Sequence, residues 1–128
     1  MENNVPVMYH VETIIEGFMF YFIIDPLITD TIVPFNFLPY GSILTSLPID
    51  YVHTLAGTAT TFARTYLHLT IGPTTILERV SVSDLIPVAV FGIDWVNSHG
   101  VHLVPNDNSI IFYGERIPLI AIPVHPLP

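Results

Sequence analysis

The sequence is most informative in the stretch Phe22-Ile23-Ile24-Asp25-Pro26-Leu27-Ile28-Thr29-Asp30-Thr31-Ile32-Val33-Pro34. One apolar run ends at Asp25, and a second ends at Pro34. Short apolar runs bounded by Pro and polar residues are typical of buried strands. We therefore expect a buried strand over Phe18–Ile24. A loop that opens with a carboxylate follows it, and then a short segment, Leu27–Val33, bracketed by two prolines.

Short strand-like segments separated by Gly and Pro continue on both sides of this stretch. The further expected strands are Val11–Glu16, Ile49–Leu55, Ala59–Ile71, Ile76–Val82, Val88–Phe91, Val101–Val104 and Ser109–Tyr113. Turn signals predict three hairpins, at Glu16-Gly17, Ala56-Gly57-Thr58 and Asn106-Asp107-Asn108. Ile93–His99 is the one segment with a helical pattern, and Gly100 is placed to end it. The pattern predicts an all-β fold with an extended tail over Ile117–Pro128.

Composition limits the class of protein. The chain has 128 residues, of which 51% are hydrophobic and 11% charged. That is enough apolar material for one buried core, so we expect a single domain over residues 1–128. Its core should cover about 9–119, with a Pro-rich tail at 120–128. The chain has no Cys, which excludes disulfides and thiolate metal sites.

Charge narrows the range of partners. Three Lys and Arg against 11 Asp and Glu give a net charge of −8, so nucleic acid and anionic membrane surfaces would repel the chain. Met1-Glu2-Asn3-Asn4 lacks the basic character of a signal peptide, and Phe18–Ile24 is far shorter than the ~20 residues that cross a bilayer. Few charges in so hydrophobic a chain indicate a surface buried against another chain. We expect no nucleic-acid or membrane partner.

The stretch around Asp25 resembles the catalytic segment of retropepsins, the aspartic proteases of retroviruses and LTR retrotransposons. Their segment has an apolar strand, Asp-Thr-Gly-Ala, a polar pair and an apolar pair often followed by Pro. Val88-Ala89-Val90-Phe91-Gly92-Ile93-Asp94-Trp95-Val96 resembles their second signature, in which an apolar pair and a Gly precede Asp or Asn and a helix. Leu55-Ala56-Gly57-Thr58-Ala59 lies where the family has its flap hairpin. The features occur in the family's order.

The resemblance implies a retropepsin-like half of a closed β-barrel, with one short helix near the C-terminal part, that pairs as a homodimer. In the family each chain supplies one Asp, and the two carboxylates share a proton while they activate water and protonate the scissile carbonyl. No cofactor and no metal is implied. The candidate catalytic residue is Asp25, the flap-tip candidates are Ala56, Gly57 and Thr58, and the other substrate-binding candidates are Thr29 and Asp30.

The chain departs from the family at Pro26 and Leu27. In the family a Thr hydroxyl and neighbouring amides brace the two Asp loops, and a Gly leaves the cleft floor bare. Pro26 lacks both the hydroxyl and a backbone N–H, and Leu27 adds a branched side chain. A misplacement of ~1 Å can lower a rate about a hundredfold, so this triplet predicts impaired catalysis. Leu27 either extends the core or faces its symmetry mate in the dimer, where its burial would contribute ~1.5–3 kcal/mol.

Three functions are consistent with the sequence. The first is a degenerate retropepsin-like homodimer, inactive or strongly impaired, that serves as a dimerisation module and holds an extended peptide or polyprotein segment by strand addition. The second is an active retroviral-type aspartic endopeptidase that uses Asp25 from each protomer. The third is an unrelated β-sandwich subunit of a virion or fibre. We expect a location inside the cell or within a virus-like particle, without secretion by a signal peptide.

Other chemistry-bearing residues give weaker patterns. The six His are scattered, and only His99 and His102 are close in sequence, with no acidic ligand at metal-binding spacing. We therefore expect no metal site. Trp95 is interpreted as a core residue at the start of the helix, and Asp94 as the N-cap of that helix.

Overall fold

The computed structural model describes residues 7–84 and 86–123. Most of this chain is strand, and α1 (Ile93–Ser98) is the one α-helix within the described ranges. The strands are β1 (Val7–Ile15), β2 (Phe18–Ile24), β3 (Ile32–Pro34), β4 (Thr45–Thr54), β5 (Gly57–Ile71), β6 (Thr74–Ser83), β7 (Ala89–Phe91), β8 (His102–Val104), β9 (Ser109–Phe112), β10 (Glu115–Pro118) and β11 (Ile120–Pro123). Short 3-10 turns occupy Phe35–Phe37 and Pro105–Asp107. The predicted all-β class with one short helix is confirmed.

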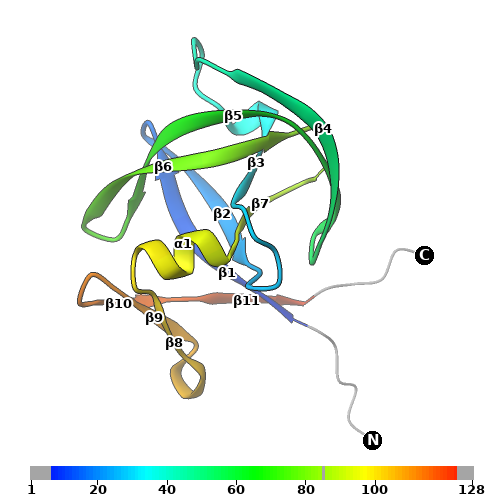
Figure 1. The fold of residues 1–128 in the computed structure, drawn as a ribbon. Helices are drawn as coiled ribbons and strands as arrows, with labels where there is room; N and C mark the ends of the chain where they lie inside the picture. The colour runs from blue at the N-terminus through cyan, green and yellow to red at the C-terminus, as the bar shows by residue number, and fades with distance from the viewer. Residues whose placement is uncertain (1–6, 85, 124–128) are drawn as a thin grey trace, which may run out of the picture.

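The strands form two sheets (Figure 1). The larger has the order β11-β1-β2-β7-β3-β6-β5-β4, and it curls until Ile14 of β1 also pairs with Thr70 of β5. The smaller has the order β10-β9-β8 and lies below α1 in the view of Figure 1. No helix within the described ranges has the length and hydropathy needed to span a bilayer.

Two short contacts between strands bring together segments that are distant in sequence. β2 pairs with β7 in parallel, with Ile24 opposite Phe91. β7 also pairs with β3, where Val90 lies opposite Ile32. Because β2 and β7 are parallel, they end at the same edge of the sheet. The residues after β2 and the residues after β7 therefore lie side by side. This edge carries the candidate site.

Most strand boundaries agree with the sequence pattern, and the differences have local causes. β4 begins at Thr45 although Pro48 lies within it, because β4 is an edge strand whose pairing shifts register between Ser46 and Asp50. Only Ile32 and Val33 of the segment Leu27–Val33 are strand, because the residues after Asp25 turn instead.

The tail is extended where it is described. Its residues form β10 and β11, and β11 pairs with β1 from Val7↔Pro123 to His10↔Ile120. This pairing starts β1 at Val7, four residues before the predicted start at Val11. Residues 124–128 of the tail lie outside the described residues.

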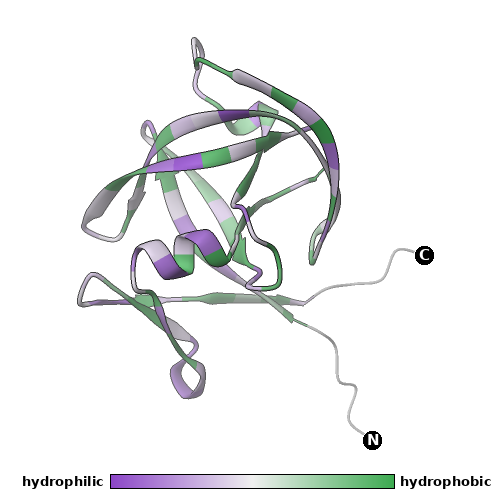
Figure 2. Ribbon diagram, in the orientation of Figure 1, coloured by the Kyte–Doolittle hydropathy of each residue, from purple (hydrophilic) through white to green (hydrophobic). Residues whose placement is uncertain are grey.

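Two apolar clusters fill the interior. The larger centres on Trp95, which is fully buried as predicted and stacks between Phe91 and Phe112 at ring distances of 3.9 and 5.7 Å. The smaller lies at the edge that carries the candidate site. Its buried members are Ile23, Ile28, Ile32, Ala59, Ile86 and Val90. Burial alternates along most of β5 and β6, and Figure 2 shows hydrophobic and hydrophilic segments on both strands.

Candidate functional site

Asp25 is the first residue after β2 and lies against the end of β7. Its backbone N–H donates to the carbonyl of Phe91 at 2.9 Å, which continues the parallel pairing of the two strands by one residue. The side chain is only 2% exposed. A buried carboxylate requires hydrogen-bond donors, and the neighbouring backbone supplies them.

Two backbone amides hold the Asp25 carboxylate. The N–H of Leu27 donates to Oδ1 at 3.1 Å, within the loop that follows β2. The N–H of Leu55 donates to Oδ2 at 3.0 Å, from the turn between β4 and β5. Each carboxylate oxygen therefore has a donor from its own chain, and one of the donors lies 30 residues away.

The residues that break the Asp-Thr-Gly pattern lie at the surface. The chain turns directly after Asp25, since the N–H of Ile28 donates to the Asp25 carbonyl at 3.3 Å. Pro26 is exposed, and the Leu27 side chain is 90% exposed. The interpretation of Leu27 as an extension of the core is therefore wrong, because the turn points this side chain outward. A fully exposed leucine beside a buried carboxylate is apolar surface without a partner within the described chain.

Asp94, from the second signature, holds the loop that follows β2. Its carboxylate accepts from the Thr31 N–H at 3.1 Å and from the Thr31 hydroxyl at 2.8 Å. The Thr31 Oγ1 accepts in turn from the Gly92 N–H at 3.1 Å. The backbone adds two bonds between the same segments, from Ile93 to Ile28 at 2.9 Å and from Asp94 to Thr29 at 3.1 Å.

The predicted N-cap role of Asp94 is wrong. The N-cap residue of α1 is Gly92, and Asp94 lies in the first turn. Its carboxylate accepts from the Trp95 N–H at 2.7 Å, and its other hydrogen bonds come from Thr31. The sequence showed no partner for Asp94 because Thr31 is 63 residues away.

Gly92 permits the close approach of the two signatures. A Cβ at this position would lie 2.9 Å from both the carbonyl carbon and the carbonyl oxygen of Asp30, and 3.0 Å from the carbonyl oxygen of Ile28. These are backbone atoms that cannot swing aside. The glycine of the second signature is therefore required by space.

The β4–β5 hairpin reaches over the Asp25 loop, as its arch in Figure 1 shows. Its turn is fixed locally, because the Thr54 hydroxyl donates to the Gly57 carbonyl at 2.7 Å and accepts from the Ala56 N–H at 3.0 Å. Gly57 has a φ of 118°, which favours glycine. The predicted flap-tip residues Ala56, Gly57 and Thr58 lie in this turn or beside it, but the contact with Asp25 comes from Leu55.

Thr29 and Asp30 line a pocket of about 300 Å³ beside the loop. Its other lining residues are Ile32, Asp50, Val52, Thr61 and Ser81. Asp50 and Val52 come from β4, so the pocket lies between the loop and the hairpin. Ala56, Gly57 and Thr58 do not line it.

The histidines do not form a metal centre in the described ranges, where no group of three or more His, Asp or Glu is arranged to hold a metal. His99 instead joins the two sheets. Its Nε2 lies 2.5 Å from the Glu78 carboxylate on β6, and its Nδ1 lies 2.6 Å from the hydroxyl of Tyr113, beside β9. Burial raises the pKa of Glu78 above its ordinary value, although the bond and the charge of His99 act in the opposite direction.

Three residues that build the site lie in the stretches that resemble the family, but the sequence did not single them out as site residues. Thr31, Leu55 and Gly92 act through a hydroxyl, a backbone amide and the absence of a side chain, and each contact crosses a large sequence separation. The order of the two signatures and the flap was the available signal. It indicated the neighbourhood of these contacts but not the contacting atoms.

These features together define the retropepsin-like fold. The structure is similar to the retroviral protease-like domain of Ddi1 from Leishmania major, with a TM-score of 0.74 and 12% identity over 90% of this chain and 95% of that chain. It is also similar to the EIAV protease complexed with the inhibitor HBY-793, with a TM-score of 0.56 and 21% identity over 81% of this chain and 99% of that chain. No protein-family model and no curated protein sequence matches the chain. At these identities the similarity establishes the fold and not the activity.

Proposed function

We propose that the chain is a degenerate retropepsin-like module that pairs as a homodimer, holds an extended peptide and has little or no proteolytic activity. One observation carries the proposal. The loop that should position a hydrolytic water has Pro26 and Leu27 at its exposed face, directly after the buried Asp25.

The chemistry of the family's site explains why this loop matters. A shared-proton pair of carboxylates must approach each other closely and hold one water between them. Pro26 has no hydroxyl and no N–H with which to brace the partner loop. Leu27 adds apolar bulk at the face that the partner loop would approach. This surface favours apolar contact between two chains over the positioning of a water.

The peptide-binding part of the proposal is supported by the pocket between loop and hairpin. Thr29, Asp30 and Asp50 give it polar and acidic groups, while Ile32 and Val52 give it apolar walls. A pocket with apolar walls and a few polar groups can accept a side chain of an extended peptide. An unrelated β-sandwich is no longer a useful alternative, because the fold is retropepsin-like.

An active aspartic endopeptidase is the second candidate, because Asp25 is retained at the end of β2. A peptidase assay in the acid range separates the two functions. We expect no turnover by the full chain above that of its Asp25→Asn variant. The double variant Pro26→Thr/Leu27→Gly, which restores the family's triplet, is the matched test of the loop. Turnover by the unmodified chain that a statine-type compound blocks and Asp25→Asn abolishes would contradict the proposal.

A further inference from the structure

The hairpin turn closes over a carboxylate of its own chain. The Leu55 N–H donates to Asp25 Oδ2 at 3.0 Å, while the Leu27 N–H occupies Oδ1 at 3.1 Å. Asp25 is 2% exposed in this arrangement. Hydrogen bonds from backbone amides to carboxylates are charge-assisted and among the stronger ones in proteins. The contact therefore holds the turn and shields the carboxylate at the same time.

Apolar packing holds the turn in the same place. Ala56, the residue after Leu55, packs against the smaller core cluster, whose members Ile23 and Ile28 flank Asp25 in sequence. Val52 of β4 packs against the same cluster. The bonds of the Thr54 hydroxyl to Gly57 and Ala56 make the turn a defined unit. The turn is thus anchored by packing, and its amide is aimed at Asp25.

We propose that this turn is an autoinhibitory latch, in which a single chain keeps its Asp25 closed with the Leu55 amide. Any group that binds Asp25 Oδ2 from outside competes with the Leu55 amide, because that amide occupies Oδ2 and the residue is almost fully buried. The competing groups would be the Asp25 loop of a second copy or the backbone of an extended peptide. That competition rests on the proposed function, whereas the closed state of the single chain does not.

Hydrogen exchange of the Leu55 amide tests the latch directly. We expect this amide to exchange at least about tenfold more slowly in the unmodified chain than in an unstructured peptide. The variant Asp25→Ala removes the acceptor and should accelerate the exchange by about tenfold or more, a factor that corresponds to about 1.4 kcal/mol. Asp50→Asn is the matched control, because Asp50 accepts from the Tyr51 amide on the same hairpin and is exposed. It should leave Leu55 unchanged.

Leu55 exchange that is equally fast in the unmodified chain and in a free peptide would overturn the latch. So would equal exchange in the unmodified chain and in Asp25→Ala, provided that amides of β5 and β6 remain protected and show that the variant is folded. Sedimentation of the same samples keeps the two proposals apart. A chain that stays monomeric with a protected Leu55 contradicts the homodimer and supports the latch. A sample kept monomeric by dilution whose Leu55 is unprotected contradicts the latch, whether or not the chain dimerises at higher concentration.

The competition is tested with Leu55→Pro, which removes the donor. Thr54 precedes this position and is extended strand, a conformation that a following proline favours. We expect the variant to dimerise at a protein concentration about tenfold lower than the unmodified chain. An unchanged or higher concentration, in a variant whose β5 and β6 amides stay protected, would show that the latch does not oppose pairing.

Discussion

Buried polar residues at the site and between the two sheets form hydrogen bonds with groups from distant parts of the chain. Thr31 is fully buried, and its hydroxyl connects the Asp94 carboxylate with the Gly92 amide. Glu78, also buried, meets His99 across the space between the two sheets. Removal of one of these partners leaves a buried polar group with fewer hydrogen bonds than it has in the folded chain.

Replacement of Thr31 by Val keeps the shape of the side chain and removes the hydroxyl. The Gly92 N–H then lacks its acceptor and Asp94 loses its shortest bond from Thr31. We expect a loss of about 1–3 kcal/mol in the free energy of unfolding, measured by urea denaturation. Thr31→Ser keeps the hydroxyl and is the control. Equal stability of the Val and Ser variants would contradict the role of the hydroxyl.

Glu78 predicts a particular dependence of stability on pH. Because burial raises its pKa in the folded chain, the folded state binds the proton more tightly than the unfolded chain. The contribution of Glu78 to the free energy of unfolding is therefore fully present below its ordinary pKa of 4.5, and it is lost as the pH rises through the raised pKa. Glu78→Gln does not ionise, so its stability should not show this loss as the pH rises. Denaturation at several pH values measures this, with the exposed Glu12→Gln as control. A pH-independent difference between Glu78→Gln and the unmodified chain would contradict it.

Among elements, the sequence was most informative where a pattern is local. The limits of β2 agree with its apolar run, and the hairpin turn was predicted at Ala56-Gly57-Thr58 because Gly and polar residues interrupt two alternating segments. The pairing of β2 with β7 could be expected only through the order of the two family signatures. The Leu55–Asp25 contact could not be predicted, because a backbone amide leaves no trace in the identity of its residue.

The packing of α1 against the Asp25 loop depends on Gly92. We expect Gly92→Ala to lower the free energy of unfolding by about 1–3 kcal/mol, because its Cβ would overlap backbone atoms of Asp30 and Ile28. Asn97→Ala on the exposed side of α1 is the control. Urea denaturation of both variants measures the effect. A Gly92→Ala protein as stable as the control would show that the two segments can move apart at little cost.

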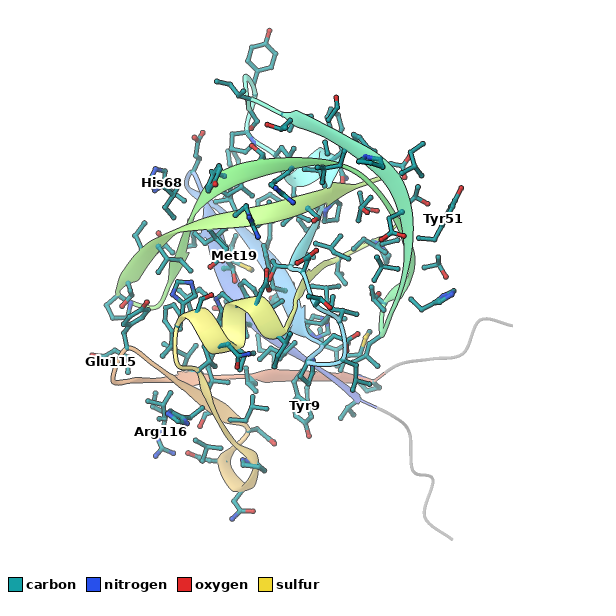
Figure 3. The ribbon with its side chains drawn as sticks, viewed as in Figure 1. Tyr9, Met19, Tyr51, His68, Glu115 and Arg116 are labelled. Atoms are coloured by element: carbon teal, nitrogen blue, oxygen red, sulfur yellow. The ribbon has the colours of Figure 1, made fainter. Side chains whose placement is uncertain are left out.

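The surface of the whole molecule carries large exposed apolar side chains of two kinds. Some project outward into solvent, as Tyr51 does from β4 in Figure 3. Others lie beside Asp25, where Leu27 is 90% exposed and Leu55 is 55% exposed. The proposed dimer would bury the Leu27 side chain, which lies directly beside the buried Asp25.

Leu27→Asp therefore tests the pairing of two chains. It places a charge at the face that would meet its symmetry mate, and it removes burial of ~1.5–3 kcal/mol for each side chain. We expect dimerisation to weaken by tenfold or more in sedimentation velocity. Leu77→Asp on β6 is the control, because Leu77 is also exposed but lies on another part of the sheet. Equal effects of the two variants would argue against pairing through the Asp25 loop.

A crystal structure of the assembled protein tests the central claim most directly, through the space between the two Asp25 carboxylates. The account predicts a two-fold pair of chains in which the Leu27 side chains meet and no water bridges the carboxylates. A water held between two closely spaced Asp25 side chains would contradict it, as would a pair that leaves both Asp25 loops uncovered.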